Sequence, residues 1–128
     1  MELNEYHKLA MRTKNPDITA EDGLLEGLMG LNGEAGEAID VLKKSKFQGH
    51  PMEKEKMVGE LGDCLWYIVR TADAMDISLE EVARFNIEKL RRRFPEGFTA
   101  EDSVKRVDVI DKLVSAVEDK LHEGNKHW

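Results

Sequence analysis

The spacing of apolar residues constrains the fold most strongly, because such residues recur every three or four positions over several long segments. Residues 23–44 carry one such row, made of Leu24, Leu28, Leu31, Ala35, Ala38 and Leu42. Residues 52–75 carry a second row, made of Met57, Leu61, Cys64, Leu65, Ile68 and Ala72. Residues 100–122 carry a third, made of Val107, Ile110, Leu113, Val114, Val117 and Leu121. This period is that of an α-helix with one apolar face, so each segment is predicted to be a helix that packs on a neighbour.

Capping and helix-breaking residues divide the chain into five predicted helices, at about residues 5–13, 23–44, 52–75, 79–94 and 100–122. The expected starting signals are Asn4, Thr19 or Asp22, Pro51, the capping box that begins at Ser78, and Thr99. Short connections between amphipathic helices predict an all-α fold, an antiparallel helical bundle of about five helices. We expect one domain over residues 1–128, with a catalytic core at about 3–98 and a C-terminal helix at about 100–122.

The composition limits the function. A formal net charge of −7 argues against binding to a nucleic acid polymer, which needs basic side chains to neutralise phosphates. It does not exclude a small anionic substrate held through a divalent cation. The single cysteine, Cys64, excludes an intrachain disulfide. The N-terminus lacks the pattern of a signal peptide, and no apolar run approaches the ~20 residues that cross a bilayer. We therefore expect a cytoplasmic protein that does not bind membranes.

Two pairs of acids lie on consecutive predicted helices. Glu34 and Glu37 are three residues apart, as are Glu60 and Asp63, and this spacing places each pair on one helix face. If the helices pack antiparallel, the four carboxylates converge and repel one another unless a cation lies between them. Oxygen ligands favour magnesium, manganese or calcium over zinc, so we expect Mg²⁺, with Mn²⁺ as an alternative.

A solvent-exposed acidic face is the ordinary explanation for one such pair. Two pairs beside apolar rows favour a cation site slightly, and the neighbouring glycines support it. These are Gly27, Gly30, Gly33, Gly36 and Gly62. Each costs a helix roughly 1 kcal/mol relative to Ala, so their number indicates close approach of a ligand or of another helix.

The two acid pairs, separated by twenty-two residues, resemble the signature of the MazG-like all-α nucleoside triphosphate pyrophosphohydrolases. Residues 33–38 and 59–63 resemble the two central helices of that family, and residues 86–95 resemble the segment that follows them. Residues 4–13 are similar to the N-terminal helix of small members from phages and bacteria. The resemblance covers about residues 3–98.

The resemblance implies hydrolysis of a nucleoside or deoxynucleoside triphosphate to the monophosphate and pyrophosphate, with Mg²⁺ required. The role that it suggests is cleansing of the nucleotide pool. By the same resemblance, the metal ligands and catalytic acids are Glu34, Glu37, Glu60 and Asp63. Asn86 and Lys89 match positions that contact the phosphates, and Arg93 is a weaker candidate. Some relatives have a further Glu where this chain has Gly33, so the general base stays open.

Aromatic residues and subunit contacts complete the expectations. Tyr67 falls on the acid side of its helix and is a candidate to line the nucleotide pocket, with core packing as the alternative. Tyr6, His7 and Arg12 are candidates to reach the base or sugar, although relatives carry Gln near His7. We expect at least a homodimer, because one subunit would expose much apolar surface, and the resemblance implies a homodimer or a tetramer built from dimers. The alternative functions are a non-catalytic dimerisation or metal-binding module, and hydrolysis of a nucleotide-like intermediate such as phosphoribosyl-ATP.

Overall fold

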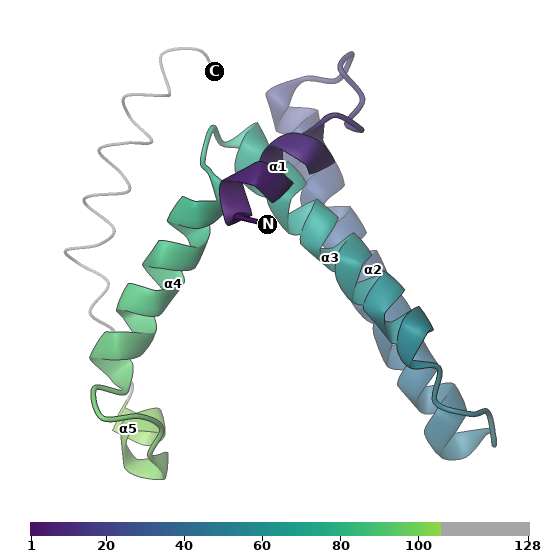
Figure 1. Ribbon diagram of the computed structural model, residues 1–128, viewed down its shortest axis with the longest axis vertical. Coiled ribbons are helices and arrows are strands. Elements are labelled where there is room, and N and C mark those ends of the chain that lie inside the picture. Colours follow the sequence, from purple (N-terminus) through teal and green to yellow (C-terminus); the bar gives the residue numbers. More distant parts are fainter. Residues whose placement is uncertain (106–128) are drawn as a thin grey trace. The chain divides into compact units, whose positions relative to one another are not determined.

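The computed structural model describes residues 1–105, which form helices joined by short connections (Figure 1). The helices are α1 (Leu3–Met11), α2 (Ala20–Phe47), α3 (Lys54–Ala74), α4 (Leu79–Arg93) and α5 (Ala100–Lys105). Residues 1–105 contain no strand, so the predicted all-α class is confirmed. The chain divides into two compact units, Met1–Leu79 and Glu80–Trp128, which are described separately. The third apolar row, at residues 107–121, lies outside the described residues.

The first unit is a helical hairpin with a short helix packed against it. Helices α2 and α3 lie side by side and antiparallel, and α1 packs on α3 (Figure 1). The buried cluster consists of Ala10, Val69 and Leu79, with Tyr6, Met11, Trp66 and Ile68 packed around it. Val69 is fully buried. The core of this unit therefore lies where α1 meets α3.

Helices α2 and α3 approach each other most closely at glycines of α2. The residues that α2 buries are Gly23, Gly27 and Val41, whereas Leu28 and Leu42 are 53% and 44% exposed. A Cβ atom added at Gly27 would lie 3.0 Å from the backbone nitrogen of Thr71. The predicted packing through the apolar row of α2 is therefore wrong at Leu28 and Leu42, which lie on the exposed side of the helix.

The helix starts agree with the sequence in part. The hydroxyl of Thr19 accepts a hydrogen bond from the backbone N–H of Asp22 at 3.0 Å, so Thr19 is the N-cap of α2. Thr99 does the same for Asp102 at the start of α5. The prediction of Asn4 as the first cap is wrong. The N-cap is Glu2, whose backbone N–H donates to the Glu5 carboxylate, and this pairing starts α1 two residues earlier.

The second and third helices also have different bounds from those predicted. Helix α2 extends three residues further at each end than the expected 23–44, and α3 begins at Lys54. Pro51 therefore precedes α3 without starting it, and that prediction is wrong. At its other end α3 stops in a left-handed turn at Asp76, with φ of 56°. The N–H of Ile77 donates to the carbonyl of Ala72 at 2.9 Å across this turn, a common way to satisfy a helix end.

The second unit, as far as it is described, contains α4 and α5. The guanidinium of Arg93 donates to the carbonyl oxygen of Ser103 at 2.8 Å, which joins the end of α4 to α5. The rings of Phe94 and Phe98 contact each other, with centroids 5.5 Å apart. Within residues 1–105, no helix combines the length and the apolar character needed to cross a bilayer. The cytoplasmic location stays a prediction.

Candidate metal centre

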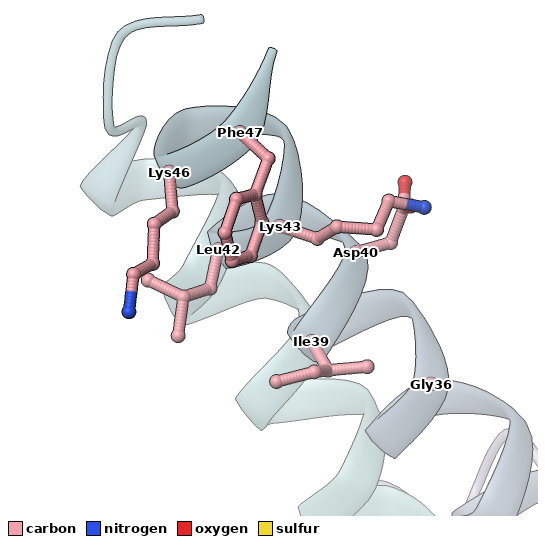
Figure 2. Close-up of a pocket in the computed structure, with 7 residues that line it drawn as sticks. All are labelled: Gly36, Ile39, Asp40, Leu42, Lys43, Lys46 and Phe47. Atoms are coloured by element: carbon pink, nitrogen blue, oxygen red, sulfur yellow. The ribbon is translucent and has the colours of Figure 1, made fainter. Parts of the chain in front are cut away.

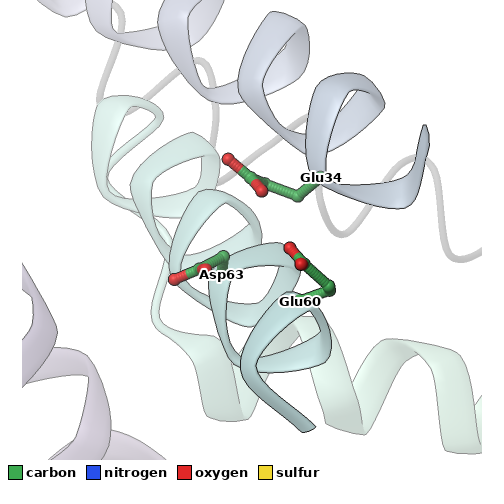
Figure 3. A group of neighbouring side chains, drawn as sticks. All are labelled: Glu34, Glu60 and Asp63. Atoms are coloured by element: carbon green, nitrogen blue, oxygen red, sulfur yellow. The ribbon is translucent and has the colours of Figure 1, made fainter. Parts of the chain in front are cut away.

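Three carboxylates meet between α2 and α3. Glu34 comes from α2, and Glu60 and Asp63 come from α3; each offers one oxygen, and the three oxygens lie within 4.8 Å of one another. Figure 3 shows the Glu34 side chain extending from its helix toward the two acids of α3. Glu34 and Glu60 are partly buried and Asp63 is exposed. Three of the four acids that were predicted to converge are therefore brought together.

The glycine contact explains why these acids can meet. A Cβ atom at Gly30 would lie 2.1 Å from the ring of Tyr67, so α2 and α3 are in close contact at this level. Glu34 follows Gly30 by about one helical turn, and Asp63 precedes Tyr67 by about one turn, since a turn takes 3.6 residues. In an antiparallel pair, the next turn beyond the close contact therefore places Glu34 opposite Asp63.

Glu37 is not part of the group of three. It is exposed and lies one turn further along α2. Its charge nevertheless reaches Glu34, whose pKa is raised above 4.5 by loss of hydration and then by the charges of Asp63, Glu60 and Glu37. The part of this rise that comes from the three neighbouring carboxylates reflects crowding of negative charge.

A divalent cation would relieve that crowding. The group offers only carboxylate oxygens, the ligand type that Mg²⁺ and Mn²⁺ prefer, and it contains no histidine or cysteine that would favour zinc. Three oxygens within 4.8 Å of one another are close enough to share one ion with ligand distances of about 2.0–2.6 Å. The residues present therefore fit a hard divalent cation.

A family model for the MazG nucleotide pyrophosphohydrolase domain matches residues 24–98, which hold all three acids, most of α2, and the whole of α3 and α4. The chain belongs to this family. Gene 37 protein of Mycobacterium phage L5 is 33% identical to this MazG domain over 85 residues, which cover 63% of this chain and 75% of that protein. No solved structure matches. Family membership supports nucleotide pyrophosphohydrolase activity, and the acidic group fits the divalent-metal dependence typical of the family.

Aromatic side chains surround the acids of the MazG domain. The Tyr67 ring packs on the backbone of Gly30 and meets Trp66 edge-on, with centroids 4.9 Å apart. Tyr67 is thus partly buried in the helix contact, and its role in lining a nucleotide pocket stays a prediction. Tyr6 approaches from α1, and its pKa is raised by burial and by the charge of Asp63. No local pattern in the sequence indicates that Tyr6 lies near Asp63, since the two residues are far apart along the chain.

The residues predicted to bind phosphate lie in the second unit. Asn86 and Lys89 are exposed on α4, about one turn apart. Arg93 is partly buried, donates to Ser103, and lies over the Phe94 ring at 5.2 Å. The guanidinium of Arg93 is therefore already engaged within its own unit. The roles of all three toward a substrate stay predictions.

An open groove lies on α2 nearer to its C-terminal end than the carboxylates (Figure 2). It is lined by Gly36, Ile39, Asp40, Leu42, Lys43, Lys46 and Phe47. Hydrogen bonds from Lys43 and Lys44 lower the pKa of Asp40 to about 2, so this acid stays ionised and paired with lysines. The groove includes none of the three clustered acids.

Proposed function

We propose that this MazG domain hydrolyses a nucleoside or deoxynucleoside triphosphate to the monophosphate and pyrophosphate, with Mg²⁺ required. The observation that carries the proposal is the convergence of Glu34, Glu60 and Asp63 within 4.8 Å, inside the segment matched by the family. The triphosphate substrate and a role in removing unwanted nucleotides rest on the resemblance described above.

The residues that would hold Mg²⁺ are Glu34, Glu60 and Asp63, with Glu37 as a further ligand or as a base one turn away. Bound there, the ion supplies charge neutralisation at the phosphate oxygens and makes phosphorus easier to attack. A carboxylate that is not fully engaged accepts the proton of the attacking water. The oxygen of that water bonds to phosphorus, the bond between the α- and β-phosphates breaks, and pyrophosphate leaves.

The side chains proposed to hold the substrate are Asn86, Lys89, Arg93 and Tyr67. The ammonium group of Lys89 and the amide of Asn86 suit the charge that grows on the leaving pyrophosphate. Arg93 is the weakest candidate, because its guanidinium already donates to Ser103. Tyr67 offers one ring edge beside the acids.

We also propose that the protein is a homodimer or a tetramer. Large apolar side chains are exposed along both helices of the hairpin, among them Leu25, Met29, Ile39, Val58 and Leu61, each at least 57% exposed. Soluble chains rarely leave such rows in water, and a second copy of the same hairpin presents rows of the same kind. Light scattering at micromolar concentration tests this, and a monomer there would contradict it.

Pyrophosphate release from a panel of nucleoside and deoxynucleoside triphosphates, with product identification, tests the activity. We expect release with Mg²⁺ and its loss in Asp63→Asn. Asp40→Asn is the matched control, since Asp40 is an acid of the hairpin that pairs with Lys43 and Lys44 instead of joining the cluster. Phosphoribosyl-ATP belongs in the panel as the alternative substrate. No release from any of these compounds would favour a non-catalytic module.

Glu37→Ala separates two arrangements of the acids. If Glu37 is a fourth ligand, the variant binds Mg²⁺ more weakly than the wild type. If Glu37 acts on the water instead, Mg²⁺ binding is kept and turnover falls. Calorimetric titration with Mg²⁺ beside the release assay distinguishes the two.

A further inference from the structure

His7 connects three helices away from the carboxylate cluster. Its Nδ1 atom accepts a hydrogen bond from the backbone N–H of Leu79, the first residue of α4, at 3.2 Å. Its Nε2 atom lies 3.4 Å from Oδ1 of Asp73 on α3. The His7 side chain is 15% exposed and Leu79 is 5% exposed, so both bonds are largely shielded from water.

These two partners select one form of the imidazole ring. A backbone N–H can only donate, so Nδ1 must carry no proton to accept from Leu79. A carboxylate accepts, so Nε2 must carry the proton and donate it to Asp73. The neutral ring protonated at Nε2 is therefore the form that satisfies both contacts.

The groups around Asp73 keep it ionised. Lys14, in the loop after α1, donates to Oδ2 of Asp73 at 2.7 Å. Arg70, which is 3% exposed, lies 3.8 Å from the same oxygen and donates to Glu26 on α2 at 2.8 Å. Burial alone would raise the pKa of Asp73, but the hydrogen bonds from Lys14 and His7 lower it on balance.

The charged groups that face His7 are thus Asp73 directly, with Lys14 and Arg70 behind it and Glu26 beyond Arg70. Glu80 and Glu81 follow Leu79 in the first turn of α4.

We propose that His7 is a positioning residue, which holds the first turn of α4 through its unprotonated Nδ1 and releases it when the ring is protonated. Protonation puts a hydrogen on Nδ1 that faces the N–H of Leu79, so a buried donor loses its acceptor. Helix α4, whose first residue this bond holds, is also the helix that carries Asn86 and Lys89.

We call the hydrogen bond between Nδ1 of His7 and the N–H of Leu79 the latch. NMR on the full chain tests it without relying on activity. At pH 8 we expect the ¹⁵N shifts of the His7 ring to show a bare Nδ1 and a protonated Nε2. Between pH 8 and 5.5, the exchange protection of the Leu79 amide, corrected for intrinsic rate, falls roughly 5-fold as the ring titrates, the size expected for one lost hydrogen bond. The Val69 amide in the core of α3 serves as the reference and keeps its protection.

Two variants separate the latch from simple packing. In His7→Asn, the amide oxygen lies two bonds from Cβ, as Nδ1 does, and does not titrate, so Leu79 stays protected at both pH values. In His7→Gln, the amide nitrogen lies three bonds from Cβ, as Nε2 does, so the contact with Asp73 is kept. The bond to Leu79 is lost, and the Leu79 amide is unprotected at both pH values.

The proposal is overturned if Leu79 protection in the wild type does not follow the charge of the ring, or if both variants lose it equally while Val69 stays protected. Should a variant unfold, shown by loss of Val69 protection, the wild-type ring decides, and a proton on Nδ1 at pH 8 refutes the latch. If no nucleotide is hydrolysed, the proposed function fails but these exchange measurements still stand.

Discussion

Replacing Gly30 by Ala tests whether the close approach of α2 and α3 brings the carboxylates together. A Cβ atom at Gly30 would lie 2.1 Å from Cε1 of Tyr67, whereas one at Gly33 meets no atom within 4 Å. Both glycines lie inside α2, so each substitution gains about 1 kcal/mol of helix propensity. Inserting a methyl group into a packed contact costs about 1–3 kcal/mol.

Gly33→Ala is therefore expected to stabilise the domain by up to about 1 kcal/mol. Gly30→Ala is expected to range from neutral to about 2 kcal/mol destabilising, which is the packing cost less the propensity gain. Urea unfolding of both variants measures the difference, and the propensity gain cancels because both substitutions are Gly to Ala in one helix.

The same pair of variants tests the metal centre. If the Tyr67 ring and the helices must separate to admit the methyl group, Glu34 moves away from Glu60 and Asp63, and Mg²⁺ binds more weakly to Gly30→Ala. Calorimetric titration should show an increased Kd for Gly30→Ala and an unchanged Kd for Gly33→Ala. Equal stability and equal Kd in the two variants would refute the link between the glycine contact and the acids.

Four further outcomes are expected. Glu34→Gln should raise the melting temperature without Mg²⁺, since the raised pKa of Glu34 reflects loss of hydration and then repulsion by neighbouring carboxylates, both of which penalise a charged group and not a neutral amide, and should lose the further rise that Mg²⁺ gives the wild type; a lower metal-free melting temperature would contradict this. The folded pKa of Asp73 lies below 3.8, so its contribution to stability is complete above that pH and disappears as pH falls through the folded pKa; in urea titrations the deficit of Asp73→Asn should shrink below about pH 4, and a constant deficit would count against it. Trp66→Phe removes the indole donor that bonds Thr13 at 2.8 Å and should cost about 1 kcal/mol in urea unfolding; an unchanged midpoint would show that this bond contributes nothing. Asp76→Gly relieves a left-handed backbone and should stabilise by about 0.5–1 kcal/mol in the same assay, while a loss of stability would mean that the aspartate side chain holds the turn.

The helical class could be predicted because it depends on local periodicity, which packing rarely overturns over segments this long. The caps at Thr19 and Thr99 were found for the same reason, since a hydroxyl and a nearby N–H suffice. The start of α1 was missed because two residues, Glu2 and Glu5, act together, and Asn4 between them is the stronger cap only when taken alone.

The face of α2 that meets α3 could not be predicted from apolar spacing. Gly27 and Leu28 are neighbours in sequence, yet a step of 100° makes one buried and leaves the other 53% exposed. Apolar spacing favours Leu28 as the contact residue, whereas the close approach of the helices requires Gly27, which has no side chain. Glycine spacing at 23, 27 and 30 was the signal that pointed to the true contact.

The acid cluster was predictable because three-residue spacing places the acids of each pair on one face of their helix. Antiparallel packing of the two helices then brings those faces together. Spacing alone could not exclude Glu37, because the pairs Glu34–Glu37 and Glu60–Asp63 are spaced alike, and only the second pair contributes both of its acids to the group. The contact of His7 with Asp73 was not predictable, since they are 66 positions apart and no local pattern relates them.

The small interior of the first unit has a consequence for the behaviour of the protein in solution. Only a few apolar side chains, such as Val69 and Leu79, are buried within the described residues, while α2 and α3 expose more. If a second copy covers those rows as proposed, folding and association are one process, and dilution alone acts as a denaturant. Substitutions among the exposed apolar residues of α2 and α3 would then reduce activity by lowering the amount of folded protein, with every carboxylate of the cluster unchanged.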